Sequence, residues 1–226
     1  MDVACYQKDM EHEDRDNIRD FLKGFESPLY FLDYETLMGG LSLYDGTRPY
    51  QQIPFQFSLH VQKDPEAELQ HFEFLHKKRT DPRKLFSEAL VEFCGNSGFI
   101  VVYNQSFEMS HNRELADSFP QFAAGLHAIN DRVVDLMEPF KKRWLYRREQ
   151  QGSYSIKYVL PAYVPGLSYE GLPIANGGDA MESYFRFVKE ALSEEEQKAL
   201  WPALSEYCKL DTFAMVELLR VLRERV

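Results

Sequence analysis

The hexapeptide FLDYET, residues 31–36, places two carboxylates, Asp33 and Glu35, directly after a run of apolar residues. The run predicts a buried strand over residues 29–33, whose side chains alternate between the two faces of a sheet. Asp33 and Glu35 then project to the same side, at the end of this strand. Two like charges on one face repel each other and lose hydration on burial, so the pair requires a group that neutralises it.

Hydrophobic periodicity and turn residues predict the rest of the fold. Strands are expected at 29–33, 53–61, 69–76, 98–104 and 132–135, with the first three antiparallel. Helices are expected at 14–25, from Asp81–Pro82 to Gly95, from Ser106 to Phe119, within 120–129, once within 152–178, at 179–192, from the capping box of Ser193 and Glu196, and at 204–225. This order indicates an α/β fold with a mixed five-stranded sheet flanked by helices.

The length of 226 residues fits one domain, with residues 1–27 as an N-terminal helical extension and 28–226 as the core. No apolar run is long enough to span a membrane, and the N-terminus has no secretory signal pattern. The odd number of distant cysteines, Cys5, Cys94 and Cys208, indicates a reducing, cytoplasmic setting. The six scattered histidines show no metal-ligand spacing.

Two further acidic positions stand out, and each has an ordinary structural interpretation. Glu108 follows Asn104 at the start of a predicted helix, where a carboxylate also benefits from the helix dipole and Asn104 can simply close the turn. Tyr207 and Asp211 are four residues apart, so both project from one helix face. Either residue can also lie at the solvated rim of that helix.

Together, FLDYET, NQSFE (104–108) and YCKLD (207–211) resemble the three motifs of the DEDD (DnaQ-like) 3′–5′ exonuclease superfamily, in its tyrosine-bearing subtype. The resemblance covers roughly residues 29–222 and implies an RNase H-like fold. VYNQSFE (102–108), GSYSIKYVLPAYVP (152–165) and YCKLDTFAM (207–215) also resemble an uncharacterised bacterial branch. The larger members of that branch often carry a second nuclease-like region, which is not expected within these 226 residues.

The resemblance implies a two-metal-ion phosphodiester hydrolase that releases nucleotides from the 3′ end of DNA or RNA, with a single-stranded end as the expected partner. Two Mg²⁺ or Mn²⁺ ions, about 3.5–4 Å apart, would be held by Asp33, Glu35, Glu108 and Asp211. Tyr207 would orient the attacking water. The family usually has Asp where this chain has Glu108, and Asp135 is the second choice of ligand if Glu108 points away.

Substrate contacts are expected from Thr36, Asn104 and Lys157. KKRWLYRR (141–148), with Arg143 and Arg147, combines five basic and two aromatic residues, which suits a groove that follows a nucleic-acid backbone. The same run is also typical of a solvated amphipathic helix. The net charge of −10 argues against nonspecific binding to nucleic acid, but is compatible with phosphates met through metal ions and a local basic patch.

Two rival functions remain open. The first is a catalytically weak or inactive RNase H-like module that binds nucleic acid without cutting it, with Glu108 as the mark of a degraded site. The second is a hydrolase of another class with paired carboxylates, such as a glycosidase, which needs its carboxyls about 5–10 Å apart across a sugar cleft. Dependence on a divalent cation separates the nuclease from the glycosidase.

Overall fold

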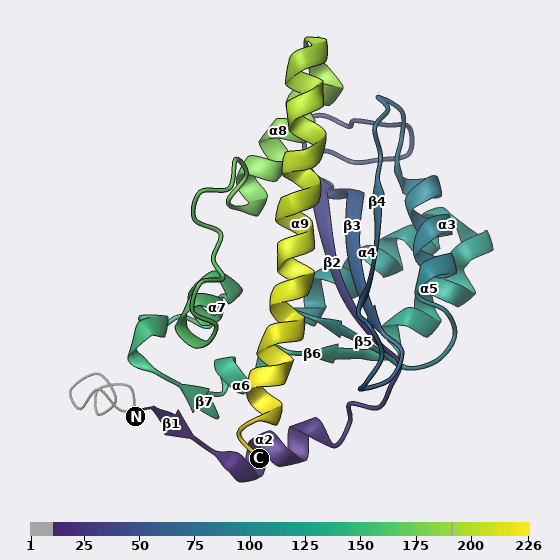
Figure 1. The fold of residues 1–226 in the computed structure, drawn as a ribbon. Helices are drawn as coiled ribbons and strands as arrows, with labels where there is room; N and C mark the ends of the chain where they lie inside the picture. The colour runs from purple at the N-terminus through teal and green to yellow at the C-terminus, as the bar shows by residue number, and fades with distance from the viewer. Residues whose placement is uncertain (1–10, 191) are drawn as a thin grey trace.

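A central sheet of five strands organises the protein, whose computed structural model describes residues 11–190 and 192–226 (Figure 1). The strands lie in the order β4 (Gln70–Leu75), β3 (Ile53–Gln62), β2 (Leu29–Leu37), β5 (Phe99–Val102) and β6 (Val133–Asp135). β2, β3 and β4 are antiparallel neighbours, whereas β5 runs parallel to β2, and β6 to β5. The predicted mixed sheet is therefore confirmed, and its strand order fits the RNase H-like description.

Helices follow the strands in the expected alternation. Their bounds are α2 (Arg15–Leu22), α3 (Arg83–Phe93), α4 (Gln105–Ser118), α5 (Ala123–Asn130), α6 (Glu138–Lys141), α7 (Ile156–Tyr163), α8 (Gly177–Lys189) and α9 (Glu194–Arg223), with 3₁₀ turns η1 (Pro120–Phe122) and η2 (Arg148–Gln150). A separate two-stranded pair joins β1 (His12–Glu13) to β7 (Leu145–Tyr146). Among the described residues, no helix combines the length and hydrophobicity that crossing a bilayer requires.

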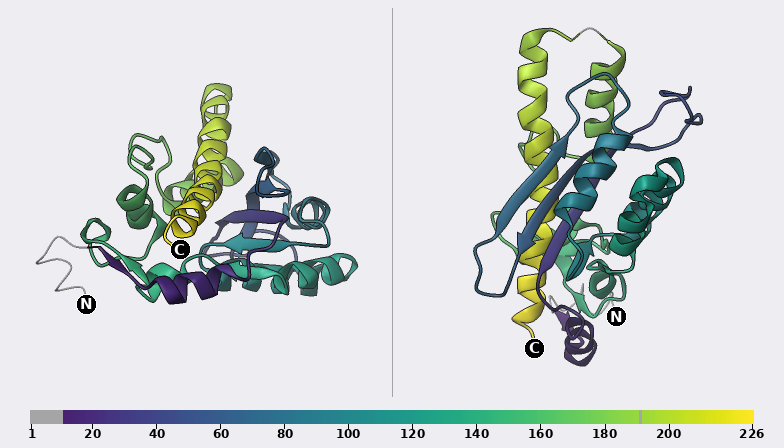
Figure 2. Two further views of the ribbon diagram at one scale, coloured as in Figure 1. Left: turned by 60° about the horizontal axis from the view of Figure 1, so that its bottom comes forward. Right: turned by 90° about the vertical axis from the view of Figure 1, so that its right-hand side faces the viewer.

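The sheet separates two apolar layers, because alternate residues of each strand face opposite sides. Leu29 and Phe31 of β2 pack towards α7, α8 and α9, whereas Leu32 and Tyr34 of the same strand pack towards α3, α4 and α5. Figure 2 shows α9 on one side of the sheet and the group of α3, α4 and α5 on the other. Asp33 and Glu35 share the parity of Phe31, so the fold directs them towards the α9 layer.

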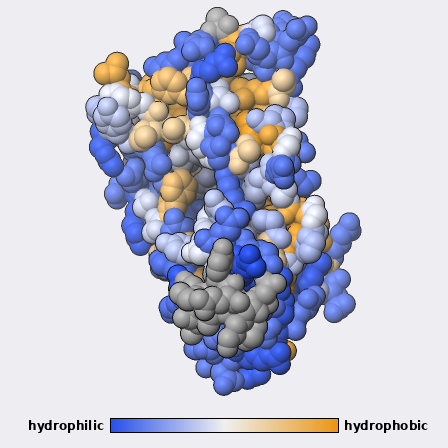
Figure 3. Space-filling view, turned by 90° about the vertical axis from the view of Figure 1, so that its left-hand side faces the viewer, coloured by the Kyte–Doolittle hydropathy of each residue, from blue (hydrophilic) through white to orange (hydrophobic). Residues whose placement is uncertain are grey.

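The side of the molecule that carries α7 is seen in Figure 3, where hydrophobic residues gather in separate patches between hydrophilic ones. The inner surface of α7 is apolar, with Val159 and Leu160 fully buried against the α9 layer. The segment 164–176 leads from α7 to α8 and brings Tyr169 and Ile174 into the same layer. This segment therefore packs against the α9 layer through its buried residues, while its other residues are mostly in contact with solvent.

Three predicted elements differ from the structure. β2 runs on to Leu37, so Asp33 and Glu35 lie within the strand and not at its end. The two predicted C-terminal helices form one 30-residue helix, α9, which begins at the predicted capping box and continues through Pro202. Buried residues on both sides of this proline, Leu200 and Leu204, hold the helix together despite the lost backbone hydrogen bond.

The basic run 141–148 is not an amphipathic helix, which was the alternative interpretation of its sequence. It spans the end of α6, strand β7 and the start of η2. Arg143 adopts a positive φ of 58°, which interrupts helical geometry between α6 and β7. Ser106, predicted to cap α4, is its second residue, and the N-cap position belongs to Asn104. Cys5 and the other residues of the N-terminal extension up to residue 10 lie outside the described part of the chain.

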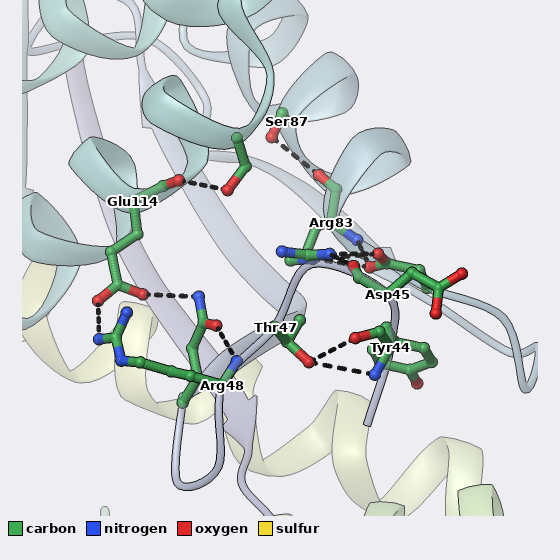
Figure 4. A network of polar contacts seen from close by, with 10 residues as sticks. Tyr44, Asp45, Thr47, Arg48, Arg83, Ser87 and Glu114 are labelled. Carbon is green, nitrogen blue, oxygen red and sulfur yellow. Dashed lines mark hydrogen bonds and ion pairs between the residues drawn. The ribbon is translucent and has the colours of Figure 1, made fainter. Parts of the chain in front are cut away.

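A long loop, residues 38–52, is fixed to α3 and α4 by the polar network in Figure 4. Arg48 and Gln51 both donate to the carboxylate of Glu114 on α4, at 2.8 and 3.0 Å. Arg83 on α3 donates to the carbonyl oxygen of Asp45 at 3.0 Å, and Thr47 donates to the carbonyl of Tyr44 at 2.6 Å. These contacts give the loop between β2 and β3 a defined course over α3 and α4.

Helix α9 is held on β3 by buried polar contacts. The Thr212 hydroxyl shares hydrogen bonds of 2.8 Å with the Ser58 hydroxyl and with Nδ1 of His60. Gln56 donates to the carbonyl oxygen of Leu204, about two helical turns before Thr212, at 3.1 Å. Ser58, His60 and Thr212 are all at most 3% exposed, so these bonds fix the rotation and register of α9 against the sheet.

Replacing Thr212 by valine removes the shared hydroxyl with little change of shape. We expect the free energy of unfolding to fall by about 1–3 kcal/mol, because Ser58 and His60 lose a buried partner. Urea denaturation followed by circular dichroism measures this. Ser97→Ala, at an exposed position, is the control, with an expected change within about 0.5 kcal/mol. Equal effects of the two substitutions would contradict the assigned role of Thr212.

Candidate active site

A cavity of about 410 Å³ opens between β2, α7, α8 and α9. Its walls contain three of the four acidic side chains that the motifs predicted, Asp33, Glu35 and Asp211, together with apolar and small residues. The lining residues are Asp33, Tyr34, Glu35, Thr36, Met38, Gln52, Phe107, Ile156, Lys157, Gly177, Gly178, Met181, Tyr207 and Asp211. Residues separated by up to 178 positions in the sequence therefore share one site.

The first acidic pair lies on the central strand β2. Asp33 pairs across the sheet with Ser58, and Glu35 pairs with Gln56. Directly after Glu35 the pairing shifts register, so that Thr36 is opposite Pro54. Such an irregularity bends a strand and redirects its side chains, which is common beside functional sites. Asp33 is partly exposed to the cavity, whereas Glu35 is 6% exposed.

The second contribution comes from the sheet-facing side of α9. Tyr207 and Asp211 are one helical turn apart and are 4% and 7% exposed. Asp211 accepts a hydrogen bond of 2.6 Å from the hydroxyl of Tyr169, which lies on the segment before α8. The Tyr169 and Tyr207 rings are 6.0 Å apart. The solvated-rim interpretation of Asp211 is therefore wrong, and this carboxylate is held in place by a buried tyrosine.

Glu108 is the third acidic contribution, from the first turn of α4. Its side chain is 2% exposed, and its Oε2 atom has no hydrogen-bond partner among the described residues. It lies close enough to Asp33 for its charge to raise the pKa of that carboxyl. Glu108 is not among the described residues that line the cavity. Glu108 is therefore a buried neighbour of the cavity residues, and its Oε2 atom is available for a ligand.

Asp135, the second-choice ligand, has a different role. Its two carboxylate oxygens accept from the backbone N–H groups of Asn104 and Gln105, at 3.0 and 3.1 Å, and Oδ1 also accepts from the N–H of Met137. Asn104 has a positive φ of 89°, which asparagine tolerates better than most residues. Asp135 therefore stabilises the turn from β5 into α4, and so positions Glu108.

The acidic groups strongly perturb one another. Burial, followed by repulsion from Asp211, Glu35 and Glu108, raises the pKa of Asp33 well above its usual value. Burial and Asp211 raise the pKa of Glu35 in the same way. The pKa of Glu108 rises to about 8, mainly through burial, and that of Asp211 to about 6, where burial outweighs the opposing hydrogen bond from Tyr169. Without a neutralising cation, burial and mutual repulsion therefore favour proton uptake by these carboxyls, and Glu108 keeps its proton at neutral pH.

Two positive features face these acids. The Nζ atom of Lys157 donates to the carbonyl oxygen of Ala175 at 2.9 Å and lies over the rings of Tyr169 and Tyr207, at 5.4 and 5.2 Å from their centroids. Helix α8 begins at the cavity with Gly177, where an added Cβ atom would be 3.8 Å from Oε2 of Glu35. The positive end of the α8 dipole thus also points to the site.

The predicted substrate residues divide into two groups. Thr36 and Lys157 line the cavity. Asn104, Arg143 and Arg147 are not among the described residues that do so. Arg147 donates to Glu11 and to the carbonyl oxygen of Ala162, so it ties the N-terminal segment to α7. Arg143 lies over the Tyr146 ring, at 5.8 Å from its centroid. The basic run therefore lies outside this cavity.

Two residues of the site were missed in the sequence. Tyr169 lies in a stretch rich in glycine and proline, where no periodicity indicates which side chain turns inward. Cys208 follows Tyr207, and its Sγ atom is 3.8 Å from Oδ2 of Asp33. The helical spacing of 204, 208 and 212 would have placed Cys208 on the face of α9 that meets the sheet.

The residues present fit a divalent cation that prefers oxygen ligands. Asp33, Glu35 and Asp211 offer carboxylates around one cavity. Glu108, which is near Asp33, has a buried oxygen without a hydrogen-bond partner among the described residues. Lys157 alone supplies one full positive charge against four carboxylates in this group. Hard cations such as Mg²⁺ and Mn²⁺ bind ligands of this kind.

The comparisons with known proteins identify a family without assigning an activity. Residues 30–155 match the family described as "Domain of unknown function (DUF2779)", and the chain belongs to this family. The matched range contains Asp33, Glu35 and Glu108, whereas Lys157 and the residues of α9 follow it.

Three mycoplasma-type relatives align over most of the chain. "Uncharacterized protein MG366" of Mycoplasma genitalium is 25% identical over 87% of this chain, and its homolog in Mycoplasma pneumoniae is 27% identical over 84%. "Uncharacterized protein UU173" of Ureaplasma parvum is 23% identical over 87%. The aligned part is 31–32% of each relative, so the chain spans about a third of their length. No solved structure matches the chain.

The raised pKa of Glu108 predicts how stability depends on pH without metal. The folded pKa, about 8, exceeds the unfolded value of about 4.3, so the folded state binds an extra proton between these values. In EDTA, the free energy of unfolding should fall as pH rises from 6 to 8.5, with on the order of 2 kcal/mol due to Glu108. Urea denaturation at each pH measures this.

The Glu108→Gln variant should lose that part of the dependence, because its side chain is neutral at every pH. Glu66→Gln, at an exposed position in the hairpin between β3 and β4, should behave like the wild type. An unchanged pH dependence in Glu108→Gln would contradict the burial of an ionisable carboxyl at this position.

Proposed function

We propose that this protein is a metal-dependent 3′–5′ exonuclease of the DEDD type that hydrolyses phosphodiester bonds of DNA or RNA. The observation that carries the proposal is the convergence of Asp33 and Glu35 from β2, Glu108 from α4 and Asp211 from α9. Their order in the chain and the tyrosine four residues before Asp211 agree with the resemblance to this superfamily.

The chemistry of the acids supports a cation of the Mg²⁺ or Mn²⁺ class. Two such ions, when bound by carboxylates of this kind, supply a water that is nucleophilic near neutral pH and stabilise charge on a phosphate. Asp33, Glu35 and Asp211 would hold them, with Glu108 turning its unpartnered oxygen towards the same group. This use of the acids would remove the mutual repulsion that raises their pKa values.

The other residues of the cavity suit an anionic substrate. Lys157 and the N-terminal end of α8 bring positive charge to the opening, which favours a phosphate group over a neutral ligand. Thr36 offers its hydroxyl and backbone beside Glu35. Met38, Phe107 and Met181 form apolar wall, against which the flat face of a nucleobase can pack. A 3′-terminal nucleotide combines these two chemical features.

Tyr207 would orient the attacking water. Its pKa is raised above the usual value by burial and by Asp211, so the hydroxyl keeps its proton and can donate a hydrogen bond. Tyr169 is a positioning residue in this scheme, since its hydroxyl donates to Asp211.

Incubation of 5′-labelled DNA and RNA oligonucleotides with the protein and Mn²⁺ tests the activity. We expect a ladder of shortened products, abolished by EDTA, and a rate reduced at least about a hundredfold in Asp33→Asn. Asp64→Asn, an exposed acid in the β3–β4 hairpin, is the matched control and should keep the wild-type rate. Identical ladders from wild type and Asp33→Asn would reveal a contaminating nuclease and sink the assignment.

Tyr207→Phe tests the role of the hydroxyl separately. The rate constant at saturating substrate should fall at least about tenfold with little change in KM, because the ring remains and only the proton donor to the water is lost. Tyr158→Phe, at an exposed position on α7, should leave both constants unchanged. A rise in KM alone would instead assign Tyr207 to substrate binding.

A binding module without cleavage is the second candidate, favoured by the position of Glu108 behind the cavity wall. In that case, fluorescence anisotropy would detect binding of a single-stranded oligonucleotide, while no metal ion would produce a ladder. Glu108→Asp, which restores the residue usual in the superfamily, would then be expected to introduce cleavage.

A further inference from the structure

The thiol of Cys208 faces the carboxylate site and not an apolar pocket. Its Sγ atom lies 3.8 Å both from Oδ2 and from the backbone oxygen of Asp33. The side chain is fully buried, and burial together with the nearby Asp33, Glu35 and Asp211 carboxylates raises the pKa of its thiol well above the usual value. Cys94, by contrast, is buried in the apolar layer with Leu90 and Ile100. The two buried cysteines therefore have different surroundings.

The thiol, Asp33 and Glu35 have the spacing of ligands to one metal ion. One sulfur and two carboxylate oxygens from these residues all lie within 4.8 Å of one another. In a tetrahedral zinc site, a sulfur at about 2.3 Å and an oxygen at about 2.1 Å from the ion are about 3.6 Å apart. The Sγ–Oδ2 separation of 3.8 Å is close to this value.

Glu108 supplies an independent sign of an absent ligand. Its Oε2 atom is buried without a hydrogen-bond partner among the described residues, although the side chain is only 2% exposed. Its charge contributes to the raised pKa of Asp33, so the two carboxyls are near each other. Glu108 is not one of the residues whose ligand atoms lie within 4.8 Å of one another, so it is a neighbour of that group and not its fourth ligand.

We propose that Cys208, Asp33 and Glu35 form a binding site for a thiophilic divalent cation of the Zn²⁺ class. Binding forms one metal–sulfur bond and releases the thiol proton to solvent. Sulfur is a poor ligand for Mg²⁺ and a good one for Zn²⁺, so Cys208 discriminates between the two classes. Because the site uses Asp33 and Glu35, zinc excludes the all-oxygen arrangement of the proposed hydrolase and inhibits it.

Cobalt(II) replaces zinc as a spectroscopic probe, since a Co²⁺–thiolate bond gives a charge-transfer band in the near ultraviolet. All proteins carry Cys5→Ser, so that Cys94 and Cys208 are their only thiols. We expect the band in this parent protein and in Cys94→Ala, and its loss in Cys208→Ala. Calorimetric titration should show Zn²⁺ binding weakened at least about tenfold in Cys208→Ala, with Mn²⁺ binding changed less than about twofold.

Circular dichroism in EDTA establishes that each variant is folded, and Cys208→Ser serves in place of Cys208→Ala if the latter is not. A band that persists without Cys208, no band in the parent protein, or equal weakening of Zn²⁺ and Mn²⁺ binding would overturn the proposal.

The outcome is separable from that of the proposed function. A Cys208-dependent cobalt band in a protein that cleaves no oligonucleotide would support the thiolate site and refute the exonuclease. Cleavage with Mn²⁺ that added Zn²⁺ does not inhibit, with no cobalt band, would refute the thiolate site and support the exonuclease.

Discussion

The burial of four carboxyl groups in one place is the constraint on which the rest of the structure depends. Two full negative charges 4 Å apart repel by about 4 kcal/mol at an effective dielectric constant of 20. The whole folding free energy of a typical domain is only about 5–15 kcal/mol. Asp33, Glu35, Glu108 and Asp211 therefore cannot all be ionised and uncompensated. They must take up protons, as their raised pKa values indicate, or bind cations.

The surrounding fold keeps these groups together at this cost. β2 is the middle strand of the sheet, paired with β5 over residues 29–31 and with β3 along its whole length, and the pairing with β3 holds the backbone of Asp33 and Glu35 in place. α9 is fixed over them by the hydrogen bonds of its Thr212 hydroxyl and Leu204 carbonyl oxygen with Ser58 and Gln56 of β3. Asp135 fixes the start of α4 and with it Glu108. The polar residues outside the cavity thus act mainly to prevent the acids from relaxing away from one another.

Sequence patterns were sufficient for the sheet and for the acidic residues. Alternation and short apolar runs located all five strands, because strands buried on a sheet face have a strong period-two or continuous apolar signal. The single continuous α9 was missed, since Pro202 lies where the local pattern resembles a boundary between two helices. The course of 141–148 was also missed, because charge and aromatic content describe a surface without fixing its backbone.

The site was predictable only in part, for a related reason. Asp33, Tyr207 and Asp211 lie on regular elements, where spacing determines the face on which a side chain projects. Tyr169 lies on an irregular segment, and its hydrogen bond to Asp211 depends on tertiary packing that no local pattern encodes. In the basic run, by contrast, a residue was predicted to bind substrate but has another role. Arg147 has the charge to bind a phosphate, but its hydrogen-bond partners are Glu11 and the carbonyl oxygen of Ala162.

The family match ends at residue 155, before helix α9, which contributes part of the candidate site. Residues 30–155 contain the sheet with Asp33, Glu35 and Glu108. They do not contain α9, which buries Glu35 and contributes Tyr207, Cys208 and Asp211. Without that helix, the strand carboxylates would be solvated, would lose their raised pKa values and would have little reason to bind a cation tightly. The proposed chemistry therefore needs the sheet and the C-terminal helix jointly, and the sheet alone gives only half of the proposed carboxylate ligands.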